Sequence, residues 1–243
     1  MAKIFITGSA DGLGQLAAKE LIALGHQVVL QARDEKRGQE AINKVPGANG
    51  VVTADLGSID ETVQLAWKVN ALGRFDAVIH NAGVYTASPN DIFAVNTLAP
   101  YILTCLIERP ERLIYLSSGM HKQGRAKLES FKSGASRITY SDSKLHVVMF
   151  AKAVARRWPD VYANALDPGW VPTKMGGPGA TDSLESGYET QVWLSVSDDP
   201  EAKVSGRYFH HKKEEQSNPE ADDIELQDRF LSLCEEITGI TLP

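Results

Sequence analysis

Short apolar segments alternate with helical segments along almost the whole chain, and this alternation limits the fold more than any other feature. The expected strands are continuously apolar, which is typical of strands covered on both faces. The sequence therefore predicts an α/β fold: a doubly wound, parallel sheet of about seven strands with helices on both faces. Strands are expected near residues 4–6, 28–30, 51–54, 75–80, 112–117, 161–166 and 207–210, and helices near residues 13–24, 34–45, 58–72, 91–107, 139–158 and 223–237.

No internal repeat or linker divides the 243 residues, so we expect one domain over residues 1–243. Two segments interrupt the alternation. Residues 119–137 are polar and lack apolar periodicity, which predicts an insertion loop. Residues 168–182 are rich in proline and glycine, which predicts a mobile loop and, over about 170–193, a lid on the substrate site.

The charge balance argues against nucleic acid and anionic membrane as partners. Lys plus Arg is 25 and Asp plus Glu is 31, giving a net charge of −6. The longest uncharged apolar stretch, residues 92–107, contains Asn96 and Pro100 and is too short to span a bilayer. The first expected strand follows Met1 too closely to leave room for a signal peptide, so we expect a cytoplasmic protein.

The cysteines and histidines do not predict a metal site. Cys105 and Cys234 lie far apart in apolar helical segments, which favours two buried thiols over a disulfide or a metal centre. The six histidines are scattered and show no zinc-ligand spacing.

A glycine-rich turn joins the first expected strand to the first helix, in the segment Thr7–Gly14. Glycines at this place let the backbone approach a pyrophosphate and let the helix pack close to the strand. The helix N-terminus adds a positive partial charge. Such a turn alone is weak evidence for a nucleotide, because a tight strand-to-helix connection can also use glycine.

The spacing Gly-x-x-x-Gly-x-Gly resembles that of the short-chain dehydrogenase/reductase family, single-domain branch. Three more matches follow in the family's order: Asn81-Ala82-Gly83, Tyr140-x-x-x-Lys144 and Pro168-Gly169. Ser118 and Tyr140 are 22 residues apart, and this long separation is similar to that of retinol-dehydrogenase-like and ketoreductase-like members. The resemblance implies a Rossmann-like fold that interconverts a carbonyl and a secondary or primary alcohol by hydride transfer with a nicotinamide cofactor.

The resemblance also implies the residues that bind this cofactor. They are Gly8, Ser9, Asp11, Gly12, Leu13, Gly14, Asp55, Leu56, Asn81, Ala82, Gly83, Tyr140, Lys144, Pro168, Gly169, Val171 and Thr173. Arg33 joins them on the chemistry of its own position.

The end of the second strand predicts NADP(H) in preference to NAD(H). An NAD site places a carboxylate there for the ribose 2′-OH, and this chain has Ala32 instead. Arg33 follows and can bind a 2′-phosphate through charge-assisted hydrogen bonds. The alternative is a surface arginine paired with Asp34 or Glu35.

Four residues are candidates for catalysis. Tyr140 and Lys144 share one face of a helix, and the nearby ammonium and the positive nicotinamide ring are both expected to lower the tyrosine pKa from about 10. The resemblance makes Tyr140 the general acid/base, Lys144 its tuning partner, Ser118 a donor to the substrate oxygen, and Asn96 part of a water-linked proton relay. Pro100 fits a helix whose hydrogen bonding is disturbed near Asn96. His80 replaces the family's commoner asparagine, and we assign it no catalysis.

Partners and alternatives complete the predictions. Met120, Trp170, Met175, Tyr188 and Trp193 either line an apolar pocket for a small-molecule substrate or pack under a lid. By resemblance, the chain pairs as a homodimer or homotetramer through the helices bearing Asn96 and Tyr140. A catalytically silent NADP(H)-binding regulator on the same fold is the rival reading of the function, and the presence of all the catalytic residues argues against it.

Overall fold

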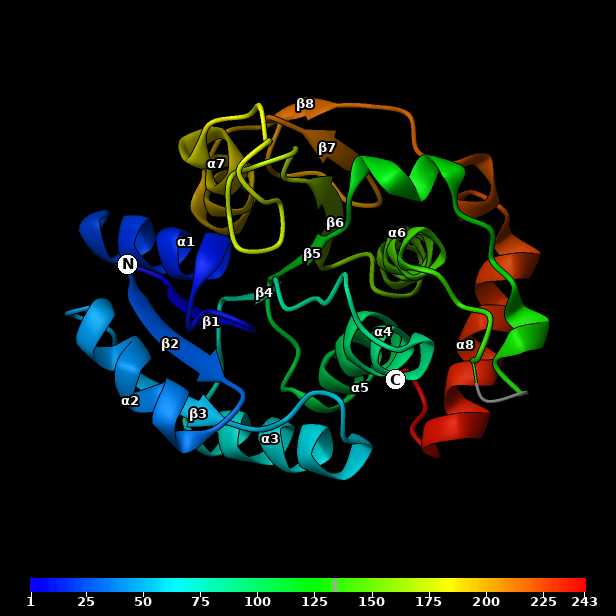
Figure 1. Ribbon diagram of the computed structural model, residues 1–243, viewed down its shortest axis with the longest axis horizontal. Helices are drawn as coiled ribbons and strands as arrows, with labels where there is room; N and C mark the ends of the chain where they lie inside the picture. Colours follow the sequence, from blue (N-terminus) through cyan, green and yellow to red (C-terminus); the bar gives the residue numbers. More distant parts are fainter. Residues whose placement is uncertain (133–134) are drawn as a thin grey trace.

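An eight-stranded sheet forms the centre of the computed structural model, which describes residues 1–132 and 135–243 (Figure 1). The strand order is β3-β2-β1-β4-β5-β6-β7-β8, and every neighbouring pair is parallel except β7 and β8. The strands are β1 Lys3–Ile6, β2 Gln27–Ala32, β3 Gly50–Thr53, β4 Ala77–His80, β5 Arg112–Leu116, β6 Tyr162–Asp167, β7 Tyr208–His210 and β8 Lys213–Glu214. The predicted doubly wound α/β fold is confirmed, with one short antiparallel strand added.

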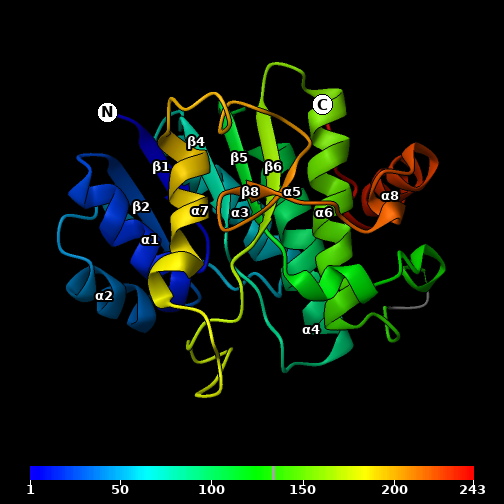
Figure 2. The same cartoon turned by 90° about the horizontal axis from the view of Figure 1, so that it is seen from above.

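Helices cover both faces of the sheet (Figures 1 and 2). On one face lie α1 Gly12–Ala23, α2 Glu35–Lys44 and α7 Leu184–Val196, and on the other lie α3 Ile59–Ala71, α5 Ala99–Leu106, α6 Tyr140–Arg157 and α8 Ile224–Thr238. Neighbouring strand residues point to opposite faces: Phe5 enters the core under α3, α5 and α6, whereas Ile4 and Ile6 enter the core under α1 and α7. The central strands are thereby buried on both sides, whereas the edge strands β3 and β8 are only partly buried or exposed.

The expected helix over residues 91–107 is three segments. They are α4 Pro89–Phe93, the π-helix η1 Ala94–Leu98 and α5. The prediction of disturbed hydrogen bonding around Asn96 is confirmed, because Asn96 lies at the centre of the π segment.

Residues 119–137 are not the open loop that we expected. They contain the 3₁₀ segments η2 Gly119–Gln123 and η3 Leu128–Ser130, and Leu128 and Phe131 are buried in the core. A third 3₁₀ segment, η4 Pro219–Ala221, precedes α8. Residues 133 and 134, which the insertion prediction also covers, lie outside the described residues.

The expected lid over residues 170–193 is half loop and half helix. Residues 170–182 have no regular secondary structure, but α7 begins at Leu184. Tyr188 and Trp193 pack against the core, and Trp193 contacts the Phe209 ring edge-on, so these two aromatics stabilise the fold and are not among the residues that line the main cleft.

Candidate active site

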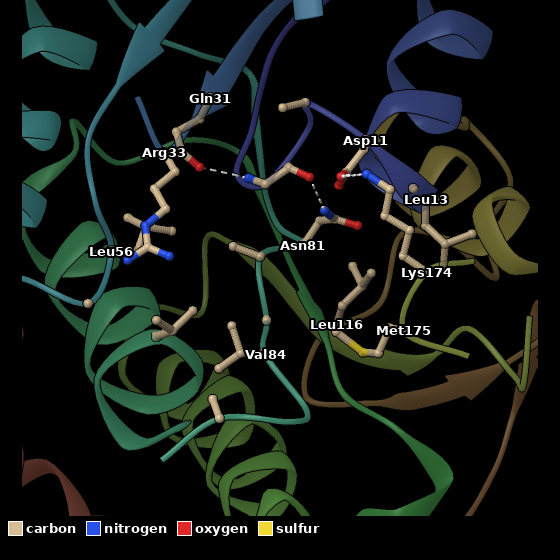
Figure 3. A pocket seen from close by; sticks show the side chains of 18 of the residues that line it. Asp11, Leu13, Gln31, Arg33, Leu56, Asn81, Val84, Leu116, Lys174 and Met175 are labelled. Carbon is tan, nitrogen blue, oxygen red and sulfur yellow. Dashed lines mark hydrogen bonds and ion pairs between the residues drawn. The ribbon is translucent and has the colours of Figure 1, made fainter. Parts of the chain in front are cut away.

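A cleft of about 720 Å³ opens at the carboxyl ends of the strands, where the strand order reverses between β1 and β4 (Figure 3). Open parallel sheets bind their ligands at this place. Figure 3 shows Arg33 and Leu56 on one side of the cleft and Lys174 and Met175 on the other.

The glycine-rich turn is held by the residue that begins the second predicted motif. The Asn81 Nδ2 donates to the carbonyls of Thr7 and Gly8 at 2.9 and 3.0 Å. A Cβ atom on Gly14 would lie 2.4 Å from that nitrogen, so only glycine fits there. Gly12 has a φ of +58° and no atom within 4 Å of its Cβ position, and it lines the cleft, so the backbone here is open to a ligand.

Most of the predicted cofactor residues line this cleft: Gly8, Asp11, Gly12, Leu13, Arg33, Asp55, Leu56, Asn81, Ala82, Gly83, Tyr140, Lys144, Pro168 and Thr173. Gly14, Gly169 and Val171 are not among the lining residues, and Val171 is buried. Ser9 is also buried: its Oγ donates to Ile6 O at 2.8 Å and accepts from Gln31 N at 2.9 Å, so it holds the turn against β2.

Arg33 makes an ion pair that the sequence did not predict. Its Nε and Nη2 donate to Oδ2 of Asp55 at 2.9 and 2.7 Å, and its side chain stays 69% exposed. The proposed surface partners are engaged elsewhere: Asp34 caps α2, and Glu35 accepts from Thr53. Partial burial raises the pKa of Asp55, but hydrogen bonds from Gly57 N and Arg33 outweigh it and leave the pKa below its usual value.

Arg37 is a cleft residue that the sequence analysis missed. It lies in the first turn of α2 and lines the cleft together with Arg33. Its guanidinium has no ion-pair partner within residues 1–132 and 135–243. The position of Arg37 in the sequence could have predicted this, because a residue in the first turn of the helix after β2 faces the same edge of the sheet as Arg33.

Lys144 lies buried at the other end of the cleft. Its Nζ donates to Leu116 O at 2.8 Å, and burial lowers its pKa to about 8 against a smaller opposing effect of Asp167. A Cβ atom on Gly83 would come within 3.2 Å of the ammonium, so the absence of a side chain there keeps the lysine accessible from the cleft.

Tyr140 has a pKa raised to about 12, whereas the sequence predicted a lowered one. Burial is the main cause; the charge of Asp167 and the neighbouring Tyr85 add to it, and a hydrogen bond with the Ser118 side chain opposes it. The Lys144 ammonium lies 5.5 Å from the centre of the phenol ring and donates to a backbone carbonyl, so it does not reverse the effect of burial. The phenol is therefore protonated at neutral pH in this structure.

The serines after β5 have different roles. The Ser117 Oγ donates to Lys144 O at 2.8 Å and is buried, so it fastens β5 to α6. Ser118 is partly exposed, accepts from Met120 N at 3.2 Å, and its side chain lies near enough to Tyr140 to lower the tyrosine pKa. The structure thus brings Ser118 and Tyr140 together, as the resemblance implied.

Asn96 is buried behind the cleft. Its Nδ2 donates to Val84 O at 2.9 Å and to Ser143 Oγ at 3.0 Å, and its Oδ1 accepts from Val84 N at 2.8 Å. The side chain therefore fixes the loop after Gly83 against α6.

The remaining titratable groups fit structural roles. His80 is buried, stacks on Tyr115 and has a pKa lowered to about 3 by burial, so it is neutral. Cys105 and Cys234 are free and buried, as predicted. In the described part of the chain, no three His, Cys, Asp or Glu residues are grouped as metal ligands. Within the same residues, every helix is too short or too polar to cross a bilayer.

Comparison with known proteins agrees with this geometry. The family profile of the short chain dehydrogenases matches residues 2–110. The chain is similar to short-chain dehydrogenase chyC of Penicillium rubens, with 43% identity over the whole of both chains. It is also similar to retinol dehydrogenase 14 of Mus musculus, with 30% identity over 98% of this chain and 86% of the relative.

A solved structure shares the fold at lower identity. Blue fluorescent protein from a metagenomic library, solved in complex with NADPH, superposes with a TM-score of 0.72 at 18% identity, covering 86% of this chain and 95% of that chain. Taken with the sequence relatives, the alternating fold and the cleft mark a nicotinamide-dependent oxidoreductase. This chain belongs to the short-chain dehydrogenase/reductase family.

Proposed function

We propose that this protein is an NADP(H)-dependent oxidoreductase that interconverts a carbonyl and an alcohol, with Tyr140 as the general acid/base. The observation that carries the proposal is that one cleft has basic side chains at one end and a tyrosine–lysine pair at the other. Arg33 and Arg37 line one end, and Tyr140 and Lys144 line the other. The open backbone at Gly12 fits a pyrophosphate between them.

The chain's own residues supply the proton chemistry. The Tyr140 phenol, protonated at neutral pH, donates to the carbonyl oxygen, and Ser118 donates a hydrogen bond to the same oxygen. The Lys144 ammonium lies 5.5 Å from the centre of the phenol ring and offers donors for ribose hydroxyls. The nicotinamide, when bound, supplies the hydride.

Exposed apolar side chains support an apolar substrate. Tyr85, Met120, Trp170 and Met175 are 38–54% exposed and lie in the segments that follow β4, β5 and β6, at the edge of the sheet that bears the cleft. Tyr85 packs edge-on against Tyr140 with ring centres 4.8 Å apart. We propose further that residues 1–243 act as one nucleotide-binding domain, and that the protein works in the cytoplasm, where two unpaired thiols remain reduced.

The test is NADPH oxidation with a panel of apolar aldehydes and ketones. Tyr140→Phe should lower kcat by about 10²–10⁴-fold, since it removes the proton donor, and leave NADPH affinity unchanged. Tyr162→Phe makes the same change outside the cleft and is the control. Wild-type protein that binds NADPH but reduces no carbonyl would establish the silent regulator instead.

A further inference from the structure

Tyr140 is the first residue of α6, in the turn whose N–H groups lack backbone acceptors. Thr139 caps this turn: its Oγ1 accepts from Asp142 N at 3.3 Å, and the Asp142 carboxylate accepts from Thr139 N at 2.8 Å. The orientation of the Tyr140 phenol therefore depends on how firmly Asp142 is held.

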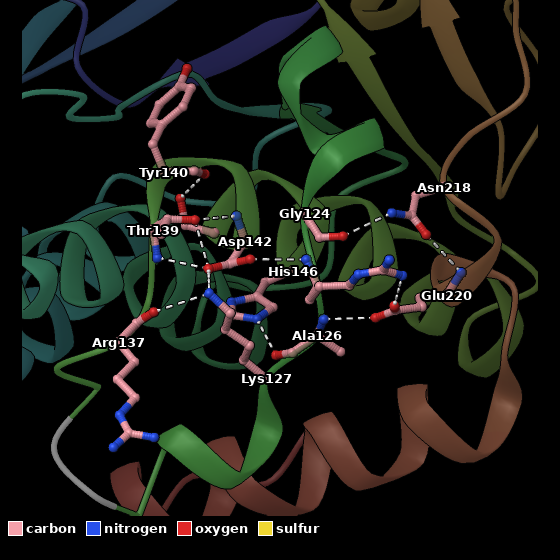
Figure 4. Close-up of polar contacts among 12 residues, drawn as sticks. Gly124, Ala126, Lys127, Arg137, Thr139, Tyr140, Asp142, His146, Asn218 and Glu220 are labelled. Atoms are coloured by element: carbon pink, nitrogen blue, oxygen red, sulfur yellow. Dashed lines mark hydrogen bonds and ion pairs between the residues drawn. The ribbon is translucent and has the colours of Figure 1, made fainter.

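The Asp142 carboxylate also binds the insertion. Its side chain is 3% exposed, its Oδ1 accepts from Arg125 N at 2.9 Å, and its Oδ2 accepts from Lys127 Nζ at 2.8 Å (Figure 4). Burial raises the pKa of Asp142, but the Lys127 ammonium and the Thr139 donors outweigh it, so the carboxylate stays charged. A residue of the insertion thus neutralises a buried charge two positions from Tyr140.

Lys127 is held in an unusual backbone conformation for this contact. Its φ of +43° and ψ of +37° lie in the left-handed region, which is unfavourable for a residue with a side chain. Its Nζ also donates to Arg137 O at 3.3 Å, just before Thr139. The Lys127 ammonium therefore bonds both to the segment just before α6 and to the first turn of α6.

The insertion is fastened on its outer side as well. Ala126 N donates to Glu220 Oε2 at 2.7 Å, and Asn218 Nδ2 donates to Gly124 O at 3.0 Å. A Cβ atom on Gly124 would lie 2.4 Å from Ser141 O, so the insertion backbone rests directly on the first turn of α6. The segment before α8 thus presses the insertion against that turn (Figure 4).

His146 extends the same network toward Asn96. Its Nε2 donates to Ala126 O at 2.7 Å, so its Nδ1 accepts from Thr97 Oγ1 at 3.1 Å. Thr97 lies in the π segment next to Asn96. The insertion is therefore bonded both to the helix that bears Tyr140 and to the segment that bears Asn96.

We propose that Lys127 and Asp142 are positioning residues for Tyr140, and that the insertion is a clamp on the first turn of α6. The clamp fixes the phenol in reach of the substrate oxygen; it adds no group to the reaction. The proposal rests on the proposed function, since it assumes that Tyr140 donates the proton.

Lys127→Met tests it, because the change removes the ammonium and keeps an unbranched side chain. We expect kcat to fall about tenfold or more while NADPH affinity stays within about twofold, since only the phenol is misplaced. Lys132→Met, in the same segment but in an exposed pair with Glu236, is the matched control and should change neither. Lys127→Arg should restore most of kcat.

Wild-type kcat in Lys127→Met, or equal losses of kcat and NADPH affinity, would overturn the clamp. If an unpaired Asp142 prevents folding, the double variant Lys127→Met/Asp142→Asn removes both charges, and the same loss of kcat is expected. If the wild type reduces no carbonyl, the proposed function fails, yet the clamp remains testable by hydrogen exchange. The amides of Asp142 and Ser143 should then exchange about tenfold faster in Lys127→Met than in Lys132→Met, and equal protection would refute the clamp.

Discussion

Lys144 is a cleft residue whose charge changes close to physiological pH. Its pKa of about 8 lies below its ordinary value, because burial disfavours the ammonium, so the charged form dominates below pH 8 and is lost above it. Tyr140, with a pKa of about 12, remains a proton donor throughout this range. We therefore expect kcat/KM for carbonyl reduction to fall as the pH rises through about 8.

The measurement is the pH profile of kcat/KM from about pH 6 to about pH 10. In Lys144→Arg, kcat/KM should not decline within this pH range, because a guanidinium group does not lose its proton there. The maximum value of kcat/KM should be lower than in the wild type. A flat wild-type profile would contradict the assignment of the charge to Lys144.

Arg33 and Arg37 should set the choice of cofactor. Asp55 neutralises part of the Arg33 charge, and Arg33 is largely exposed. Replacing Arg33 alone should therefore have a modest effect on the affinity for NADPH. Arg33→Ala is expected to lower the affinity for NADPH about tenfold and to leave the affinity for NADH unchanged. The double variant Arg33→Ala/Arg37→Ala should remove the preference for NADPH over NADH. Adding Ala32→Asp should then favour NADH.

Initial rates with both cofactors at low and moderate salt measure this preference, which should shrink as salt screens the arginines. Arg74→Ala, an exposed arginine outside the cleft, is the control. Equal rates with NADPH and NADH in the wild type would show that the arginines do not read the 2′-phosphate.

Motifs predicted the residues of the site but not their partners. The sequence places Asn96 and Lys144 in their elements, yet the contacts of Asn96 with Val84 and of Arg33 with Asp55 join different elements, 12 and 22 residues apart. The Lys144 ammonium does not lower the Tyr140 pKa as expected, because burial, which depends on the whole surrounding structure, outweighs it.

At the scale of elements, the periodicity of apolar residues did not predict the segments that pack on several sides. Helix α7 packs against both α1 and the sheet, so its apolar residues do not form one stripe, and a Cβ on Gly187 would touch Val171 at 2.8 Å. In the insertion, Phe131 contacts Phe93, His146 and Phe230 from three different helices. The apolar residues of α7 and of the insertion therefore recur with neither a helical nor a strand period, and the sequence did not predict how these segments pack.

The loop over residues 170–182 should respond to cofactor, and α7 should not. Within the loop, Thr173, Lys174 and Met175 line the cleft, and the exposed Lys174 is held there by an ion pair of 3.1 Å with Asp11. Because such a pair is weak, we expect amides of residues 170–182 to exchange rapidly in the free protein and to become protected with NADPH and substrate.

Hydrogen exchange in the free and ternary states measures this difference, with α7 as the internal control. Residues 184–196 pack on the core and should be protected in both states. Equal protection of residues 170–182 in the two states would mean that the pocket is preformed and that no segment closes.

At the scale of the whole molecule, α8 and the C-terminal tail cover the face formed by α5 and α6 (Figure 1). The Tyr101 hydroxyl of α5 donates to Ile240 O at 2.6 Å, and the Trp158 indole at the end of α6 donates to Pro243 O at 2.6 Å. Cys105 of α5 and Cys234 of α8 belong to the same apolar core. The end of the chain therefore occupies the face through which the resemblance implied pairing.

We accordingly predict, against the expectation of a homodimer or homotetramer, that the chain does not associate through these helices and is a monomer. A stable interface needs roughly 800 Å² from each partner, whereas Tyr101, Ile102 and Leu103 are at most 1% exposed in the single chain. Light scattering at micromolar concentration should give the mass of one chain, 26.5 kDa. A chain ending at residue 223 lacks α8 and the tail, so it should expose this face and self-associate or aggregate. A full-length species of twice the single-chain mass would contradict the prediction, because the covered face would then have to open or another face would have to pair.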